Sequence, residues 1–435
     1  MTDQVGLIKN NSDLKRSVVL MVCDGLSREW ITQQCTPNLM RLQTLGLVCD
    51  QHQAVFPSVT RVSAASIATG CYPGSHGLHG NQMALLSQEN LTVHNVGLTG
   101  FRSAMRAATG TTLKVPTMAQ YLSAHGGQSV YSNVSPGAAY FLDPEHYGTV
   151  YHRSGSFSKG GASITGTKHL NVSHDLAGDQ AMTARFCTDL GQGQAEPLSI
   201  LWLANPDLTL HYHAPGSAEH LQALKQTDDL VGVVFEKIQQ LRATRNILLA
   251  VCSDHGHEVI GSSVHIGTWL AAQGLAAELE QGQIAVAGQG TSALLYATSS
   301  GRKALAPLLK TLAAQEWVAQ LISSESELGK VGLGKIEGLV AAIDMARSET
   351  INQHGVVGAR WMVEDGETSV EIGCGQHGGL GPQETRPFCM LNHSSCLPQV
   401  LAQPTSLVDL APTLLEFLQI PFEAMDGQSI FRHLQ

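Results

Sequence analysis

Three apolar segments, each of which ends beside an aspartate, constrain the fold of this chain more than any other feature. The segments are residues 17–23, 198–204 and 246–252. The aspartates that follow them within three residues are Asp24, Asp207 and Asp254. An unbroken apolar run rich in Val, Leu and Ile is typical of a strand buried on both faces of a parallel sheet. Since open α/β sheets bind ligands at the carboxyl ends of their strands, we expect the three acids to meet at one edge.

Helical patterns between these strands complete an α/β core. Residues 217–242 form one long amphipathic pattern, and residues 63–69 form a short one that ends at a glycine. Thr36 followed by Pro37 indicates another helix start, because proline is favoured at the first helical position. The sequence therefore predicts a mostly parallel central sheet that is flanked by helices.

The character of the chain changes between residues 258 and 374. Short apolar runs alternate there with helical patterns, which include residues 302–321 and 335–346, and no Asp-His pair follows a strand. We interpret residues 258–374 as a smaller inserted α+β cap. The predicted core then consists of residues 16–257 and 375–435.

Composition and charge limit the kinds of molecule that we expect the protein to bind. The formal net charge is −10 at pH 7, and only 14% of the residues are charged. A protein that neutralises the phosphates of a nucleic-acid duplex is usually basic, so we expect no duplex partner. No apolar run approaches the about 20 residues of a membrane span, so we expect no membrane partner. We expect a small-molecule substrate, and the oligomeric state stays open, with a homodimer as one alternative.

Cysteine usage indicates the compartment. The nine cysteines are odd in number and scattered without a Cys-x-x-Cys pair. This usage disfavours a disulfide framework and favours a reducing environment. The apolar run at residues 18–23 is too short for a signal segment and is not followed by a cleavage site. We therefore expect a cytoplasmic protein.

Histidines accompany the strand-end acids. Asp254 and His255 are adjacent after the third strand, where both side chains can reach one ion; a helix-capping Asp beside a solvated His is the alternative. Asp207 and His211 are four residues apart and share a face if this stretch is helical. His377 is followed by two glycines, which let the backbone approach a ligand closely. Each of these signals is weak by itself.

Together with Asp24, these residues form a set of carboxylates and imidazoles without a thiolate. Such a set suits two borderline divalent ions, Zn²⁺ first, with Mn²⁺ or Fe as alternatives. Two ions about 3.5–4 Å apart clamp the attacking and leaving oxygens of a displacement at phosphorus. The set therefore favours a two-metal hydrolase.

A further stretch supplies a nucleophile and a family resemblance. Thr60 lies nine residues before a Thr-Gly-x-Tyr-Pro-x-x-His-Gly stretch that starts at Thr69. Here the chain resembles the type I phosphodiesterase/nucleotide pyrophosphatase family of the alkaline phosphatase superfamily. The further motifs that match in order are Thr36-Pro37-Asn38-Leu39, the spacing of Asp207 and His211, Ser253-Asp254-His255-Gly256, Gln376-His377-Gly378, and the tail from Asp409 to Glu416.

The resemblance implies an alkaline-phosphatase-like core and a phospho-threonine mechanism on Thr60. It implies one zinc held by Asp207, His211 and His377. It implies a second zinc held by Asp24, Thr60, Asp254 and His255. The reaction would be hydrolysis of a phosphodiester or a nucleotide pyrophosphate. Phosphonoacetate hydrolase, a close relative with the same kind of site, is an alternative, and a non-enzymatic binding protein with a decayed site is a weaker one.

Three residues are candidates for binding the substrate. Ser63 stands where family members commonly carry an asparagine that donates to a phosphoryl oxygen. Arg61, next to the nucleophile, could replace that donor or point to solvent. Tyr140 could stack on a base or pack in the core. In phosphonoacetate hydrolase, lysines from an insert bind the substrate carboxylate, whereas residues 116–158 of this chain contain no lysine; Lys114, Arg153 and Lys159 could still serve.

Overall fold

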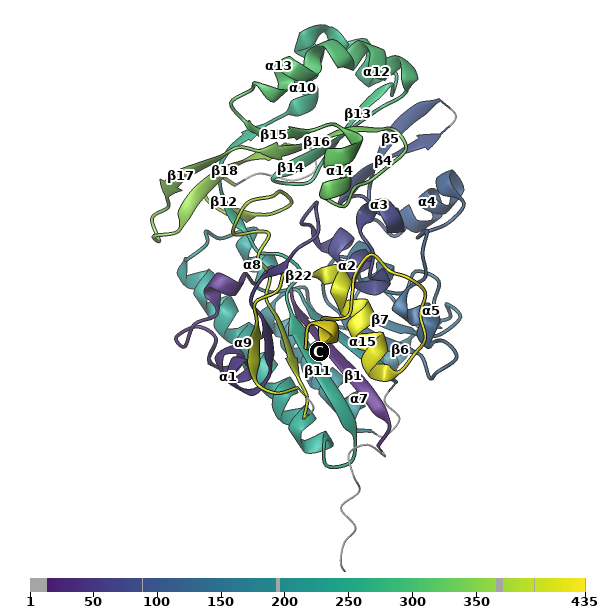
Figure 1. Cartoon of the computed structure of the whole chain (residues 1–435), viewed down its shortest axis with the longest axis vertical. Helices are drawn as coiled ribbons and strands as arrows, with labels where there is room; N and C mark the ends of the chain where they lie inside the picture. The colour runs from purple at the N-terminus through teal and green to yellow at the C-terminus, as the bar shows by residue number, and fades with distance from the viewer. Residues whose placement is uncertain (1–13, 88, 193–195, 365–370, 395, 435) are drawn as a thin grey trace, which may run out of the picture.

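The protein has an α/β fold, built around one large sheet with helices on both faces and two smaller sheets stacked beyond one end of it (Figure 1). We describe it from a computed structural model. The described residues are 14–87, 89–192, 196–364, 371–394 and 396–434.

The large sheet has ten strands in the order β21-β2-β20-β11-β1-β10-β6-β7-β8-β9. The central strands β11, β1, β10, β6 and β7 run parallel to one another, and β20 is antiparallel to β11. The bounds are β1 Arg16–Cys23, β2 Leu47–Cys49, β6 Gln128–Ser132, β7 Thr149–His152, β8 Ser156–Phe157, β9 Ser163–Ile164, β10 Leu198–Leu203, β11 Asn246–Cys252, β20 Cys389–Asn392 and β21 Gln399–Leu401. The predicted, mostly parallel central sheet is thus confirmed.

Side-chain alternation along β1 explains the layers. Val18 and Leu20 pack into one hydrophobic core, whereas Val19 and Met21 pack into another on the opposite face. This period of two follows from the pleat of a strand. The helices on the first face include α2 Thr60–Thr69, α6 Pro136–Phe141 and α15 Leu410–Leu418. The helices on the second face are α1 Pro37–Leu45, α7 Leu176–Gly191 and α9 Ala218–Leu241.

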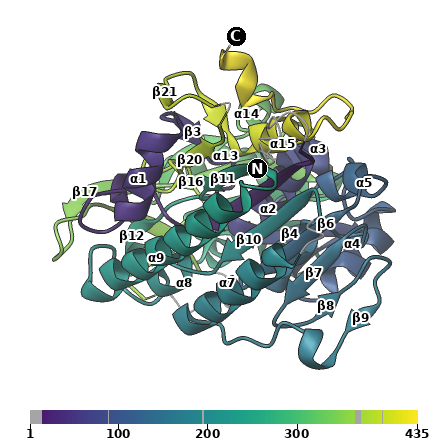
Figure 2. The same ribbon diagram turned by 90° about the horizontal axis from the view of Figure 1, so that it is seen from below.

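Figure 2 shows α7 and α9 side by side across the second face. The amphipathic pattern at residues 217–242 therefore becomes one long surface helix, as predicted. Among the helices that the structure describes, none combines the length and the apolar character needed to cross a membrane.

The two smaller sheets are built mainly from residues of the expected cap. One has the order β13-β14-β16-β15 and the other β17-β18-β12-β19. Their bounds are β12 Glu258–Val264, β13 Ile284–Gly288, β14 Ser292–Ala297, β15 Val318–Ile322, β16 Leu339–Met345, β17 Arg347–Ile351, β18 Val357–Val363 and β19 Gly375–Gln376. The helices α10 Ile266–Leu270, α12 Ser299–Leu305 and α13 Leu309–Ala313 lie above the first of these sheets in Figure 1.

Two helical expectations in this region are wrong. The pattern at residues 335–346 becomes strand β16, which is buried along its whole length between β14 and β15. The pattern at residues 302–321 is helical only at first, because Val318–Ile322 pairs with β16 as β15.

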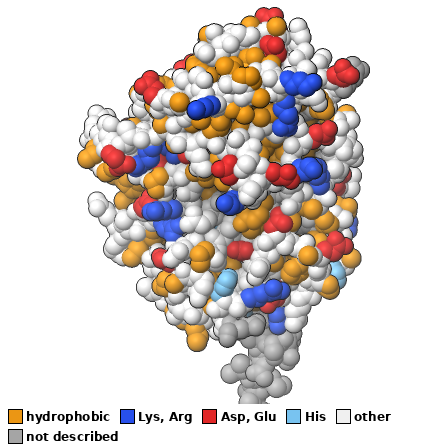
Figure 3. All heavy atoms as spheres, turned by 45° about the horizontal axis from the view of Figure 1, so that its top comes forward, with side chains coloured by type: hydrophobic (Ala, Val, Ile, Leu, Met, Phe, Trp, Pro, Cys, Tyr) orange, Lys and Arg blue, Asp and Glu red, His pale blue; other side chains and the backbone are white. Residues whose placement is uncertain are grey.

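A hairpin of the core reaches into the cap. Strands β4 Gln82–Ser87 and β5 Asn90–Asn95 form this hairpin, and their apolar residues share a hydrophobic core with residues of β13, β14 and β16. The division at residues 258 and 374 stays a prediction, since packing continues across it. On the face drawn in Figure 3, acidic and basic side chains are scattered among apolar ones without a continuous basic stripe.

Candidate metal centre and nucleophile

The first group of candidate ligands lies at the carboxyl ends of β1 and β11. Asp24 follows β1, while Asp254 and His255 follow β11. His255 Nε2 lies 3.1 Å from Asp254 Oδ2 and 3.4 Å from Asp24 Oδ1. His255 Nδ1 lies 3.2 Å from the carbonyl oxygen of Gly256, which orients the ring with Nε2 toward the acids. These three side chains form a compact buried group that could hold one metal ion.

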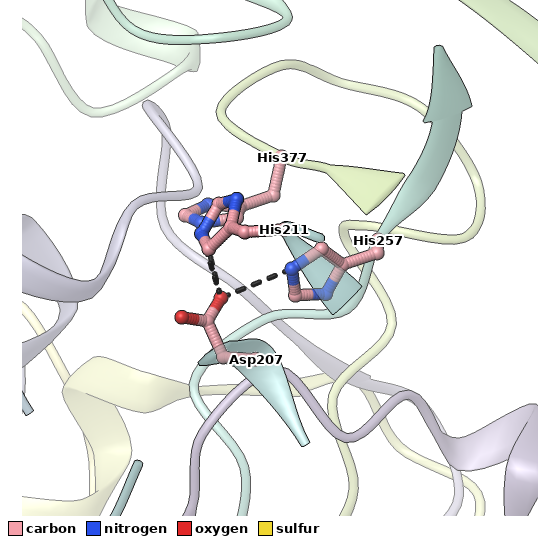
Figure 4. Close-up of side chains that lie close together, drawn as sticks. All are labelled: Asp207, His211, His257 and His377. Carbon is pink, nitrogen blue, oxygen red and sulfur yellow. Dashed lines mark ion pairs between the residues drawn. The ribbon is translucent and has the colours of Figure 1, made fainter. Parts of the chain in front are cut away.

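The second group surrounds the carboxylate of Asp207 (Figure 4). Asp207 begins the one-turn helix α8 Asp207–Leu210, so His211 lies four residues on and on the same side. The Nε2 atoms of His211 and His377 each lie 3.3 Å from Asp207 Oδ1, and that of His257 lies 3.0 Å from it. The candidate ligand atoms of these four residues lie within 4.8 Å of one another.

The two groups are neighbours. The rings of His255 and His377 stack with centroids 3.7 Å apart and an angle of 15° between their planes. In addition, the backbone N–H of Asp207 donates to the carbonyl oxygen of Asp24 over 3.1 Å. The three strand-end acids therefore meet as the sequence predicted.

Thr60 stands beside the first group. It is the first residue of α2, and its Oγ1 lies 3.1 Å from His255 Nε2. Its side chain borders a cavity of about 470 Å³ that also exposes Asp24, Asp207, His211 and His377. A hydroxyl at a helix N-terminus, facing candidate metal ligands, is placed to attack a group bound in the cavity.

The acids fit divalent cations because the chain leaves their charge uncompensated. Asp24, Asp207 and Asp254 form ion pairs only with histidines in the described part of the chain. The buried oxygens Oδ1 of Asp24, Oδ1 of Asp207 and Oδ2 of Asp254 accept no well-directed hydrogen bond. Buried carboxylates are expensive unless they are paired or bind metal.

The pKa shifts of the site residues also favour bound cations. Burial raises the pKa of Asp24 well above its ordinary value, and the charges of Asp254 and Asp207 raise it further. Burial would also raise the pKa of Asp207, but the surrounding histidines hold that pKa well below its usual range. Burial lowers the pKa of His377, which favours the neutral imidazole that binds metals. Added positive charge would relieve the crowding of carboxylates.

The outer wall of the cavity is polar. Its described lining includes amide side chains from the β4–β5 region, the cap and the segment before His377, namely Asn81, Gln82, Asn95, Gln289 and Gln376. Arg61 lies in this wall, where it donates to Ser135 Oγ over 3.2 Å and to the Asn81 carbonyl oxygen over 2.8 Å. Arg61 therefore borders the cavity, and its role as a donor to a phosphoryl oxygen stays a prediction.

Tyr140 and Ser63 lie elsewhere. Tyr140 belongs to the hydrophobic core, where its hydroxyl donates to the Gly155 carbonyl oxygen over 3.0 Å and Arg102 covers its ring at 5.0 Å. It is not among the described residues that border the cavity, so we correct the expectation of a substrate contact to core packing. Ser63 is fully buried one turn after Thr60, its Oγ without a hydrogen-bond partner and outside the described cavity lining.

A second set of buried acids, which we call the cap ion cluster, supports the loop of His377. The cluster consists of Glu258, Asp344 and Glu384 with Arg347 and Arg360. Glu384 accepts hydrogen bonds from the backbone N–H groups of Gly379 and Gly381 over 2.9 and 2.8 Å. The histidine is also held from a second segment, since His377 Nδ1 lies 2.8 Å from the Ser58 carbonyl oxygen. Such contacts fix the orientation of a ligand ring.

Sequence reasoning missed two residues of the site. His257 belongs to the second group, and its spacing of two from His255 could have indicated this, because alternate residues of an extended segment point the same way. Trp202, on β10, donates its indole N–H to Asp24 Oδ2 over 2.9 Å. No local sequence signal links a strand tryptophan to an acid 178 positions away.

Fold and site together define an α/β protein with a candidate two-metal centre beside a threonine hydroxyl. The model of the family described as type I phosphodiesterase / nucleotide pyrophosphatase matches residues 18–331, and the chain belongs to that family.

Curated relatives match slightly more than half of the chain. Venom phosphodiesterase 2 of Crotalus adamanteus is 25% identical over 249 residues, which cover 56% of this chain and 27% of that protein. Ectonucleotide pyrophosphatase/phosphodiesterase family member 3 of Rattus norvegicus is 25% identical over 247 residues, which cover 55% of this chain and 24% of that protein. The matched part thus spans about a quarter of the length of these relatives.

Solved structures match nearly the whole chain. An inactive variant of murine ectonucleotide pyrophosphatase/phosphodiesterase 5, in complex with AMP, superposes with a TM-score of 0.67 at 16% identity, covering 97% of this chain and 99% of that one. The human counterpart gives a TM-score of 0.66 at 15% identity, covering 97% and 99%. These likenesses establish an alkaline-phosphatase-like fold.

Proposed function

We propose that the protein is a two-metal hydrolase of phosphodiesters or nucleotide pyrophosphates, in which Thr60 is the nucleophile. One observation carries the proposal: Asp24 and Asp207, which have no Lys or Arg partner among the described residues, border the same cavity as Thr60, and Asp254 lies beside Asp24 in the first group. The family to which the chain belongs supports the same reaction class.

The ligands divide between two ions. Asp24, Asp254 and His255 would hold one ion beside Thr60, and Asp207, His211 and His377 would hold the other. Bound divalent ions supply the positive charge that activates a hydroxyl and stabilises a departing oxygen. Oxygen and nitrogen donors without thiolate favour Zn²⁺, with Mn²⁺ or Fe as alternatives.

The chain's own residues determine the covalent step. Thr60 Oγ1 would lose its proton to solvent and bond to phosphorus as the bond to the leaving oxygen breaks. The leaving group would depart and take up a proton, and the phosphoryl group would be carried on threonine. Water would then cleave the bond between Oγ1 and phosphorus and restore the hydroxyl. Backbone N–H groups in the first turn of α2, which begins at Thr60, would donate to the phosphoryl oxygens. The side chain of Arg61 lies in the same cavity as a further donor.

The cavity lining favours a phosphodiester over phosphonoacetate. Among its described residues none is lysine. Two of the three cations considered for binding phosphonoacetate, Arg153 and Lys159, donate to backbone carbonyl oxygens. Arg153 donates to the carbonyl oxygens of Asn133 and Val134 over 2.9 and 2.7 Å, and Lys159 donates to that of Ser123 over 3.0 Å. We therefore keep phosphonoacetate hydrolysis as an outcome of the test.

Partners and compartment follow from the same features. The substrate is a small phosphorylated molecule, since amides and one guanidinium line the cavity. The net charge of −10 supports the expectation of no duplex partner. All nine cysteines are free thiols in the described chain, which supports a reducing compartment such as the cytoplasm.

Substitution of the nucleophile tests the mechanism. Thr60→Ala should lower turnover of bis-p-nitrophenyl phosphate at least about 10³-fold, because no other hydroxyl stands at that position. Metal content, measured by elemental analysis, should not change. Thr60→Ser is the matched control: it keeps the hydroxyl and should keep measurable turnover. Wild-type turnover in Thr60→Ala would move the nucleophile elsewhere.

Substrate ranking tests the reaction. On one preparation of the full chain, kcat/KM for bis-p-nitrophenyl phosphate should exceed that for phosphonoacetate. The physical reason is the absence of lysine from the described cavity lining, which leaves little to hold a free carboxylate. Release of p-nitrophenolate and of inorganic phosphate measures the two reactions. The reverse ranking would replace the phosphodiester assignment with C–P bond cleavage.

A further inference from the structure

His257 lies outside the ligand set that the family resemblance implies, yet its ring points into the second group (Figure 4). Only 2% of its side chain is exposed, and its Nε2 lies 3.0 Å from Asp207 Oδ1. Despite that short distance, neither atom makes a well-directed hydrogen bond. An imidazole nitrogen and a carboxylate oxygen are thus buried side by side without satisfying each other, as two ligands of one ion would be.

The backbone makes room for this ring. Gly25 has a φ of +70°, and a Cβ at this position would lie 2.5 Å from His257 Cε1. His257 Nδ1 lies 3.4 Å from the carbonyl oxygen of Gly25. A proton on Nδ1 that faces this carbonyl leaves the lone pair on Nε2, on the side of Asp207.

The neighbouring rings complete the arrangement. The centroids of His211 and His377 lie 5.4 and 4.9 Å from that of His257, each at a steep angle to its plane. Three imidazole edges therefore converge on one carboxylate rather than stacking on one another. Hydrophobic packing alone does not require such convergence of polar atoms.

We propose that His257 is a fourth protein ligand of the ion held by Asp207, His211 and His377. This inference rests on the proposed function for the existence of that ion and adds a residue to its site. Catalytic zinc sites usually have three protein ligands and one open position. A fourth protein ligand would hold the ion more tightly and would favour five-coordination when the substrate binds, which Mn²⁺, Fe²⁺ and Co²⁺ also accept.

Metal binding to the metal-free full chain tests the proposal. Co²⁺ and Zn²⁺ are titrated into wild type, His257→Leu and His257→Gln, with affinity measured by chelator competition and coordination followed by the visible absorption of Co²⁺. Both substitutions should weaken one of the two equivalents at least about tenfold. Both should also change the intensity of the Co²⁺ bands. His174→Gln, which alters a histidine that borders the cavity outside both groups, should leave affinity and bands unchanged.

The two substitutions separate ligation from positioning. Gln can offer Asp207 an N–H donor, as a merely positioning histidine protonated on Nε2 would, but it lacks the imidazole lone pair. Wild-type affinity and bands in His257→Gln would make His257 a positioning residue and overturn the proposal, as would wild-type behaviour in His257→Leu. If neither variant folds, a crystal structure of the zinc-loaded wild type decides: a Nε2–metal distance of about 2.0–2.1 Å supports ligation, and a longer contact overturns it.

Asp207→Asn distinguishes failure of the inference from failure of the proposed function. If Asp207→Asn loses one metal equivalent while both His257 variants keep two, only the role of His257 is wrong. If Asp207→Asn also binds both equivalents with wild-type affinity, the proposed metal site is wrong, and the inference fails with it.

Discussion

The metal centre and the cap ion cluster each bury three carboxylates, but they balance that charge differently. In the cap ion cluster, Arg360 lies 3.1 Å from Glu384 and contacts Asp344, and Arg347 lies 3.1 Å from Glu258. In the metal centre the acids form ion pairs only with histidines among the described residues, and three of their oxygens lack hydrogen bonds. Where the chain supplies its own cations, the cluster is structural; where it supplies none, the site is available for ions from solution.

Removing metal should have the largest effect. Treatment with EDTA should reduce turnover of bis-p-nitrophenyl phosphate below detection, because the metal centre contains no cation of its own. Adding back about two equivalents of zinc should restore it. Free zinc at 100 times its Kd should also raise the free energy of unfolding by about 2.7 kcal/mol per site. Turnover that persists without metal would contradict the proposed difference, in which the metal centre needs ions from solution and the cap ion cluster does not.

Removing a cation from the cap ion cluster should be the next largest effect. Arg360→Met should lower the free energy of unfolding by about 3–5 kcal/mol, because Asp344 and Glu384 would stay buried without it. Denaturant unfolding measures this change. Arg41→Met, which removes an exposed ion pair with Glu236, is the control and should cost less than about 1 kcal/mol. Equal costs for the two would mean that the cap ion cluster is not structurally essential.

The smallest effect is expected at Tyr140. Tyr140→Phe removes the hydrogen bond to Gly155 and should lower the free energy of unfolding by about 1 kcal/mol. Its kcat/KM should equal that of wild type, since the ring lies in the core. A rise in KM at unchanged stability would instead place Tyr140 among the groups that sense the substrate.

The sequence was most informative where strands end. Apolar runs followed by Asp24, Asp207 and Asp254 predicted both the parallel strands and the meeting of the acids, because strand direction and burial are visible in a run of Val and Leu. The cap was harder. Residues 339–343 form an apolar run without a clear period, and only pairing with β14 and β15 makes it a strand.

Contacts between residues that are far apart in the sequence could not be predicted. The carbonyl oxygen of Ser58 that orients His377 comes from a loop 319 positions away, and the acids that hold the His377 loop pair with arginines of the cap. Such partners depend on tertiary packing rather than on local spacing. His257 is intermediate, since its alternation with His255 was visible but does not by itself indicate a ligand.

The cavity is assembled from two sources, and this has an evolutionary consequence. Its floor consists of strand-end residues of the central sheet, whereas residues 288–290 and 362–363, outside that sheet, contribute to its rim. Insertions or exchanges in the rim would alter which molecules fit without disturbing the reactive floor. A single inherited chemistry could in this way be redirected to new compounds by remodelling the rim alone.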